Sequence, residues 1–196
     1  MTHYPTHPLS ESDLLAAVIF ATEAHAGQVR KHIGEPYILH PLRVSHTLAM
    51  RGMPYAVLIA GVLHDVVEDC GVSLGELTRK FGADVSALVD QVTNVAQPKD
   101  GNRKARAAID LAHITKCSPA GATIKLADIL DNVPSIVAND LPFAAIYVPE
   151  KLAQLEVLRH GDASLVRRVH DLLAQASVEV GDNPVSSSRF YSEVAK

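Results

Sequence analysis

Residues 55–70 read YAVLIAGVLHDVVEDC, an almost unbroken apolar run followed by one histidine and three acids. The four ionisable residues are His64, Asp65, Glu68 and Asp69. A segment that is apolar on all sides indicates a helix in the middle of the protein, covered by other elements. An ionised carboxylate buried there without a partner loses several kcal/mol of hydration free energy. The acids therefore call for a cation nearby.

The residues that flank this stretch predict one continuous helix, because Pro54 can begin it and Gly71 can end it. At about 100° per residue, the four ionisable side chains fall within an arc of roughly 140° on one helix face. They occupy the last two turns, where the helix dipole disfavours each acid by roughly 0.3–1 kcal/mol. The alternative is an exposed helix end with hydrated acids. We favour a bound cation, since water reaches a central helix less easily.

Two further residues are candidate ligands for that cation. His40 directly precedes Pro41, at the expected start of another helix, where the backbone before a proline is extended. Asp128 lies in the mostly apolar segment IKLADILDN, one helical turn before Asn132. A mixed set of histidine and carboxylate ligands suits a six-coordinate ion such as Mn²⁺ or Fe²⁺ better than a structural zinc ion.

The rest of the chain predicts an all-α single domain, with helix signals throughout and no strand pattern. A first helix is expected over roughly 11–26, with Leu14, Leu15, Val18 and Ile19 facing the core. Pro134 is expected to break the helix that begins after Ser118. We expect the remaining helices over about 41–51, 74–81, 84–93, 103–117, 149–159 and 163–177. The expected organisation is a flexible segment 1–9, a domain over 10–178 and a mobile tail over 179–196.

Composition limits the partners and the compartment. The chain has 196 residues, 47% of them hydrophobic, and a formal net charge of −4, which argues against a nucleic-acid partner. It has neither a run of about 18 apolar residues nor a secretory signal, so we expect no membrane partner and a cytoplasmic location. Two cysteines are too few for a disulfide scaffold. A homo-oligomer is left open.

The motifs occur in a telling order: AHAGQ (24–28), RK (30–31), GEPYILHP (34–41), HDVVED (64–69), FG (81–82), VT (92–93) and KLADILDN (125–132). This ordered set resembles the HD-domain phosphohydrolases. It is similar, more narrowly, to the small alarmone hydrolases and the hydrolase region of Rel/Spo proteins. The resemblance covers residues 25–160 and implies a helical HD-type fold. It includes no synthetase region, so we expect degradation of the alarmone only.

The resemblance implies a role for each matching residue. It assigns one Mn²⁺ ion to four ligands, namely His40, His64, Asp65 and Asp128, and it assigns the attacking water to Glu68 and Asp69. The implied substrate contacts are Arg30 and Lys31 on the guanine base, Asn132 on the nucleoside, Ser135 in place of a threonine, and Tyr147 near the substrate. The basic cluster of Arg103, Lys104 and Arg106 is a candidate phosphate contact.

The implied reaction removes the 3′-pyrophosphate from the purine nucleotide (p)ppGpp, giving GDP or GTP and pyrophosphate. Two departures concern the pyrophosphate contacts: Ile129 stands where the family usually has Arg or Lys, and Asp131 adds an acid. One alternative keeps the site but acts on (p)ppApp, pApp or NADPH. Another is a catalytically silent nucleotide-binding protein, which the presence of both Glu68 and Asp69 disfavours.

Overall fold

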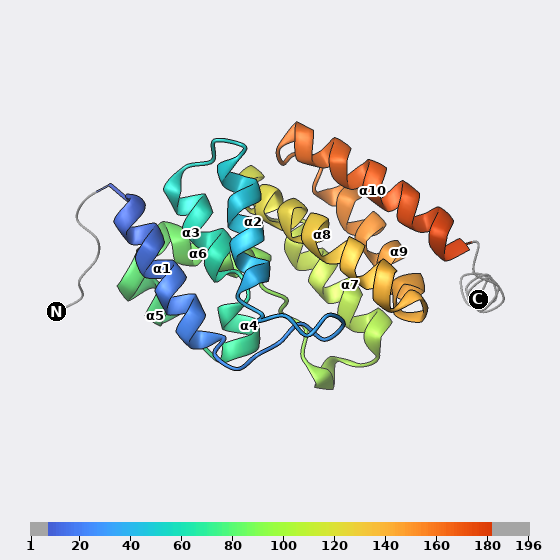
Figure 1. Cartoon of the computed structure of the whole chain (residues 1–196), viewed down its shortest axis with the longest axis horizontal. Coiled ribbons are helices and arrows are strands. Elements are labelled where there is room, and N and C mark those ends of the chain that lie inside the picture. Colours follow the sequence, from blue (N-terminus) through green and yellow to red (C-terminus); the bar gives the residue numbers. More distant parts are fainter. Residues whose placement is uncertain (1–7, 182–196) are drawn as a thin grey trace.

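The computed structural model describes residues 8–181, and that part of the chain is helical, with one isolated β-bridge between Val29 and Pro36 (Figure 1). The all-α, single-domain prediction is confirmed. The elements are α1 Glu11–Ala24, α2 Leu39–Ala49, α3 Tyr55–Leu63, α4 Val66–Cys70, α5 Leu74–Phe81, α6 Ala83–Val92, the 3₁₀ turn η1 Pro98–Asp100, α7 Arg103–Ile114, α8 Pro119–Asn139, α9 Leu141–Val157 and α10 Ala163–Gly181.

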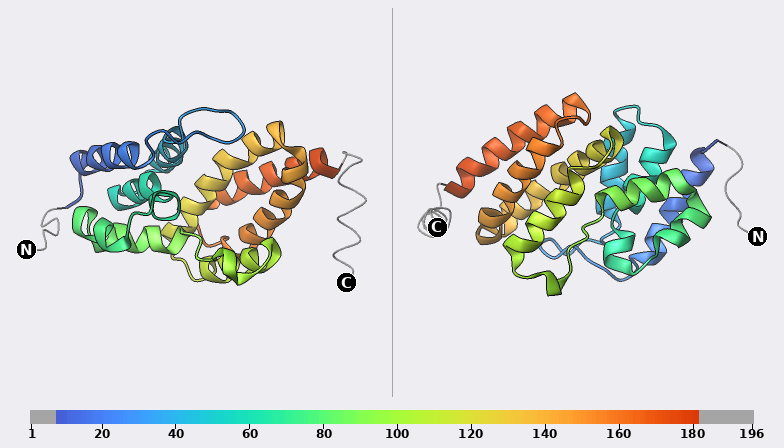
Figure 2. Two further views of the ribbon diagram at one scale, coloured as in Figure 1. Left: turned by 90° about the horizontal axis from the view of Figure 1, so that it is seen from below. Right: turned by 180° about the vertical axis from the view of Figure 1, so that it is seen from behind.

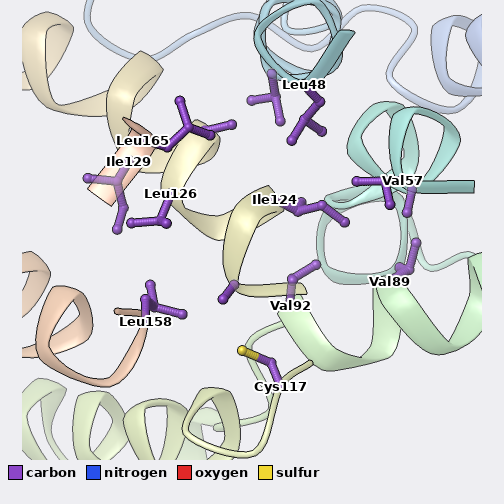
Figure 3. Packing of buried hydrophobic residues seen from close by; sticks show 14 of the residues in the cluster. Leu48, Val57, Val89, Val92, Cys117, Ile124, Leu126, Ile129, Leu158 and Leu165 are labelled. Atoms are coloured by element: carbon purple, nitrogen blue, oxygen red, sulfur yellow. The ribbon is translucent and has the colours of Figure 1, made fainter. Parts of the chain in front are cut away.

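Helix α8 runs through the centre of the molecule and contacts α2, α3, α6, α9 and α10. Its residues 121–129 are all buried. In Figure 3, Leu126 and Ile129 point toward Leu158 and Leu165, while Ile124 lies on the side of α3 and α6. Views from below and behind show α1 and α10 at opposite ends of the long axis, with α8 between them (Figure 2). The core is therefore built around α8.

The expected single helix over 54–71 is wrong, because the chain turns at His64 and Asp65. Helix α3 ends at Leu63, Asp65 takes φ −99° and ψ −8°, and α4 begins at Val66. Gly71, at φ +70°, ends α4 as expected. Each apolar run remains packed, since Leu63 and Val66 are both fully buried. The turn removes His64 and Asp65 from the helical repeat and presents them at a junction between two helices.

The expected break at Pro134 is also wrong. Helix α8 continues through Pro134 to Asn139, and α9 likewise contains Pro149, so the helix expected over 149–159 begins earlier, at Leu141. A proline inside a helix costs about 3 kcal/mol through its missing N–H and a steric clash. Burial of Val133, Ile136 and Val137 against the core offsets this cost. Packing of these side chains therefore outweighs the tendency of Pro134 to end the helix.

Helix α1 buries a different face from the one expected. Ala17 and Ala21 are fully buried and Leu14 and Val18 are partly buried, whereas Leu15 and Ile19 are 64% and 60% exposed. Small residues at the contact let α1 approach α3 closely, and this turns the two bulky side chains outward.

The last helix extends slightly beyond the expected end of the domain. Helix α10 continues to Gly181, past the expected limit at 178, while most of the expected tail and residues 1–7 lie outside the described part of the chain. Within residues 8–181, no helix combines the length and the apolar character needed to span a lipid bilayer.

Candidate functional site

The four candidate metal ligands converge from three parts of the fold. His40 lies in the first turn of α2, His64 and Asp65 form the junction of α3 and α4, and Asp128 lies in the middle of α8. His40 Nε2 is 3.5 Å from Asp65 Oδ2 and 3.3 Å from Asp128 Oδ1. His64 Nε2 is 3.1 Å from Asp65 Oδ2 and 3.9 Å from Asp128 Oδ1. The structure thus brings together residues that are up to 88 positions apart in sequence.

Both histidines present Nε2 to the centre of this group because Nδ1 is held elsewhere. His64 Nδ1 is 2.9 Å from the Gly61 carbonyl oxygen, so Nδ1 carries the hydrogen and donates it. His64 Nε2 is buried and has no hydrogen-bond partner among the described residues. A buried ring nitrogen without a hydrogen bond is costly in a protein, and metal coordination would satisfy it.

The donor set fits a divalent ion. Ligand atoms of His40, His64 and Asp65 all lie within 4.8 Å of one another. Asp128 adds a second buried carboxylate, whose Oδ2 also pairs with Lys125 Nζ at 3.1 Å. Two imidazole nitrogens with carboxylate oxygens suit Mn²⁺, Fe²⁺ or a similar ion, and thiolates, which zinc often selects, are absent from the set.

The acids at this centre are strongly biased toward ionisation. Burial alone would raise the pKa of Asp65 and Asp128, but nearby His64 and Lys125, respectively, hold each pKa well below its ordinary value. Burial also opposes the charge on His40, yet hydrogen bonds to Asp128 and Asp131 raise its pKa to about 9. A proton on His40 therefore competes with a metal ion for Nε2.

Asp131 connects His40 to two arginines. Its Oδ2 lies 2.7 Å from His40 Nδ1 and 3.3 Å from Arg30 Nη1, and its Oδ1 accepts from Arg43 Nε at 2.6 Å. A carboxylate on the far ring nitrogen fixes the tautomer and orientation of a metal-ligating histidine. The sequence showed Asp131 only as an added acid, because its partner His40 lies 91 residues away.

Glu68 and Asp69, the candidate catalytic acids, lie on the short helix α4 and remain accessible to solvent. Asn94 binds Glu68 through both its side-chain amide (3.1 Å) and its backbone N–H (3.3 Å). Desolvation by the surrounding protein raises the pKa of Glu68 and of Asp69. The Tyr37 hydroxyl donates to Asp65 Oδ2 at 2.8 Å. Sequence reasoning missed Asn94 and Tyr37, although they stand beside the VT and within the GEPYILHP motifs.

Of the residues expected to contact the nucleoside, some lie beside the candidate metal ligands and others do not. Asn132 and Ser135 lie one and two turns after Asp128 on the same face of α8, and the Asn132 amide donates to Asp128. Arg30 is buried and paired with Asp131, whereas Lys31 is exposed, with its Nζ 5.9 Å from the centre of the Phe143 ring. The structure therefore places Arg30 as part of the framework around Asp131.

The three residues of the expected basic cluster, Arg103, Lys104 and Arg106, lie in different surroundings. Lys104 and Arg106 make no hydrogen bond or ion pair with the site residues in the described part of the chain, and Arg106 instead donates to the Gly101 carbonyl. Arg103 pairs with Glu150 through two hydrogen bonds of 2.9 and 2.7 Å and lies over the Phe143 ring at 4.8 Å. Phe143, not singled out by the sequence, lies 5.6 Å from Tyr147 between ring centres.

Comparison with known proteins agrees with this architecture. An HD domain family model matches residues 17–172. The chain is 38% identical over 136 residues to the guanosine-3′,5′-bis(diphosphate) 3′-pyrophosphohydrolase of Aquifex aeolicus, a match that covers 69% of this chain and 19% of that protein. A Vibrio cholerae protein of the same name is 35% identical over 68% of this chain and 19% of its own length. The chain thus spans about a fifth of these two bacterial relatives.

Two further similarities involve proteins of comparable size. The guanosine-3′,5′-bis(diphosphate) 3′-pyrophosphohydrolase MESH1 of Xenopus tropicalis is 38% identical over 123 residues, covering 61% of this chain and 67% of that protein. A solved structure described as a metazoan ortholog of SpoT that hydrolyzes ppGpp aligns with a TM-score of 0.76 and 29% identity, covering 87% of this chain and 97% of that one.

Proposed function

This chain belongs to the HD domain family, and from that premise we propose that it is a metal-dependent hydrolase that removes the 3′-pyrophosphate from (p)ppGpp, giving GDP or GTP and pyrophosphate. The observation that carries the proposal is the unpartnered Nε2 of buried His64, which faces Asp65 and Asp128 beside two solvent-accessible carboxylates. The relatives named for this reaction and the ordered motifs support the choice of substrate.

His40, His64, Asp65 and Asp128 would hold one divalent ion, which we propose is Mn²⁺. A bound divalent ion supplies Lewis acidity to the phosphate and to the attacking water. Tyr37 holds Asp65 through its hydroxyl, and Asp131 holds His40 through Nδ1, so that each ligand keeps its orientation. Lys125 pairs with Asp128 Oδ2, so the oxygen that would face the ion is Oδ1, which also accepts from the Asn132 amide.

Glu68 and Asp69 would orient the attacking water and take its proton. A base works best when its pKa approaches the working pH, and partial desolvation moves the pKa of both carboxyls in that direction. The two hydrogen bonds from Asn94 fix the Glu68 carboxylate in position. Because both acids remain accessible to solvent, water and substrate can reach them.

The nucleoside would lie along α8 and α9. In this arrangement Lys31 contacts the purine beside Phe143, Asn132 and Ser135 contact the sugar from α8, and Tyr147 closes the far side. Arg30 would contact the base while it remains paired with Asp131. Small-molecule purine nucleotides are therefore the proposed ligands.

A substrate panel tests the proposal. Protein reconstituted with Mn²⁺ is incubated with ppGpp, ppApp, pApp and NADPH, and the release of pyrophosphate and of phosphate is followed separately. We expect pyrophosphate from ppGpp at the highest kcat/KM. Faster turnover of ppApp, or phosphate release from pApp or NADPH in preference to ppGpp hydrolysis, would replace the proposed substrate with the adenine-nucleotide or NADPH alternative.

A further inference from the structure

Lys151 is a buried ammonium group that the mechanism above does not use. It lies on α9 two turns after Phe143 and one turn after Tyr147, on the face that carries both aromatic rings. The residue is only 9% exposed, and its Nζ lies 4.7 Å from the centre of the Tyr147 ring. Lysine is seldom buried to this extent unless an anion accompanies it.

No anion accompanies Lys151 in the described part of the chain. Its one hydrogen bond there is donated by Nζ to the neutral Gln154 Oε1 at 3.1 Å, so the ammonium keeps N–H donors that form no hydrogen bond. Lys125, which is also buried, differs in this respect, because its Nζ pairs with Asp128. Glu150, the acid next to Lys151, is already bound by Arg103 through both oxygens.

The surroundings of Lys151 connect it to the metal centre. Burial and the charge of Lys125 lower its pKa to about 8, and Asp128, Glu150 and Arg103 act on it as well. At neutral pH the ammonium form is therefore still the larger fraction. Lys151 packs against Tyr147, and burial together with the negative charges of Asp128 and Asp65 raises the pKa of the Tyr147 hydroxyl. Helix α9 packs against α8, so Lys151 lies on the helix next to the one that carries Asp128.

We propose that Lys151 is a substrate-binding residue that contacts the outer phosphate of the pyrophosphate group, while the inner phosphate lies at the metal centre. This assignment rests on the proposed function for the identity of the ligand. An ammonium group that is shielded from water and has unused N–H donors binds a phosphate oxygen strongly. The phosphate replaces the hydrogen bonds to water that the group lost on burial and supplies a counter-charge. Lys151 also supplies positive charge on α9, where α8 has Ile129 instead of the basic residue that the motif usually carries.

Binding of inorganic pyrophosphate to the Mn²⁺-loaded protein, measured by calorimetry, tests the proposal. Lys151→Met keeps the length of the side chain and removes its charge, and Lys116→Met is the matched control, since Lys116 is exposed and far from α9 in sequence. We expect Lys151→Met to weaken pyrophosphate binding roughly 10- to 100-fold. Lys116→Met should leave it unchanged. Equal affinity in wild type and Lys151→Met would overturn the assignment.

Thermal unfolding separates a binding role from a structural one. Replacing a buried charge that has no counter-ion with an apolar side chain is expected to leave the Tm unchanged or raise it. Lys151→Gln is a second variant, which removes the charge but keeps a polar side chain. We expect it to weaken pyrophosphate binding as Lys151→Met does. A lower Tm in both variants, together with loss of Mn²⁺ binding, would show a structural role and contradict the proposal.

The two proposals fail in different ways. If the wild-type protein does not hydrolyse ppGpp, the proposed function is wrong. If pyrophosphate affinity is the same with and without the Lys151 ammonium, the inference about Lys151 is wrong, whatever nucleotide the wild type hydrolyses.

Discussion

At the scale of single residues, His40 and His64 are set for metal binding by what their Nδ1 atoms contact. One ring is held by the Asp131 carboxylate and the other by the Gly61 carbonyl, and each presents Nε2 to Asp65 and Asp128. A carbonyl accepts a hydrogen bond without adding charge, whereas a carboxylate also raises the basicity of the ring. The two histidines are therefore not equivalent, and His40 depends on Asp131.

Replacement of Asp131 tests that dependence. Asp131→Asn removes the charge behind His40, and we expect the affinity for Mn²⁺ to fall about 10- to 100-fold, the usual effect of losing such a partner. The measurement is a Mn²⁺ titration followed by calorimetry. Asp171→Asn is the matched control, since the Asp171 side chain is 81% exposed. Unchanged affinity in Asp131→Asn would mean that His40 is positioned by packing alone.

Glu68 can be separated from the metal ligands in the same way. Glu68→Gln keeps the size of the side chain and an oxygen that can accept from Asn94, but it removes the basicity. If Glu68 takes the proton of the attacking water, kcat for ppGpp should fall roughly 10²- to 10⁴-fold while bound Mn²⁺ stays at the wild-type level.

Metal content by atomic absorption and kcat by pyrophosphate release provide the two readouts for this variant. Glu23→Gln, an exposed acid on α1, serves as the control. Loss of Mn²⁺ from Glu68→Gln, restored by excess metal, would make Glu68 a ligand. A wild-type rate would remove it from the mechanism and leave Asp69 as the local base.

At the scale of elements, the site depends on how closely α2 and α3 pack. A Cβ atom added to Gly61 would lie 2.6 Å from Leu48 Cδ1 and 3.5 Å from Ser45 Cα, and Leu48 is fully buried with little room to move. The same glycine provides the carbonyl that holds His64. Close contact of these helices thus fixes the relative position of His40 and His64.

Gly61→Ala should therefore lower the free energy of unfolding by roughly 1–3 kcal/mol through overpacking. Gly75→Ala is the matched control: it is also helical, but the nearest atom to an added Cβ is Arg79 Nη1 at 3.7 Å. That change should raise stability by roughly 0.5–1 kcal/mol, because alanine favours helix more than glycine does. Urea denaturation gives both values. An increase in stability for Gly61→Ala as well as for Gly75→Ala would show that α2 and α3 tolerate separation.

The sequence predicted the helical class and most helices, because these follow from apolar periodicity and cap residues; the ligand set stays a prediction that came from the order of the motifs. It did not predict the turn at His64 and Asp65, since both flanking segments read as one apolar helix. It also placed a break at Pro134, where burial of neighbouring side chains outweighs the local cost. Contacts such as Asn94 with Glu68 and Asp131 with His40 depend on tertiary packing, which spacing along the chain does not reveal.

At the scale of the whole molecule, the fold is built around α8, which carries Asp128, Asn132 and Ser135 and packs against α2, α3, α6, α9 and α10. A bound ion would join α2, the α3–α4 junction and α8. The apo protein should therefore have a lower Tm than the Mn²⁺-loaded protein, because a ligand that binds only the native state adds about 2.7 kcal/mol at 100 times its Kd.

The central claim is that the His40–His64–Asp65–Asp128 centre supports removal of pyrophosphate from (p)ppGpp. The most direct test is phosphorus NMR of ppGpp after timed incubation with the Mn²⁺-loaded protein, recorded once the paramagnetic Mn²⁺ has been removed on a chelating resin, with His64→Ala as the comparison. We predict that GDP and pyrophosphate signals grow together in equal amounts with the wild type, and that His64→Ala neither retains Mn²⁺ nor produces them. Intact ppGpp after incubation with metal-replete wild type, or the same products from a metal-free His64→Ala variant, would contradict the account.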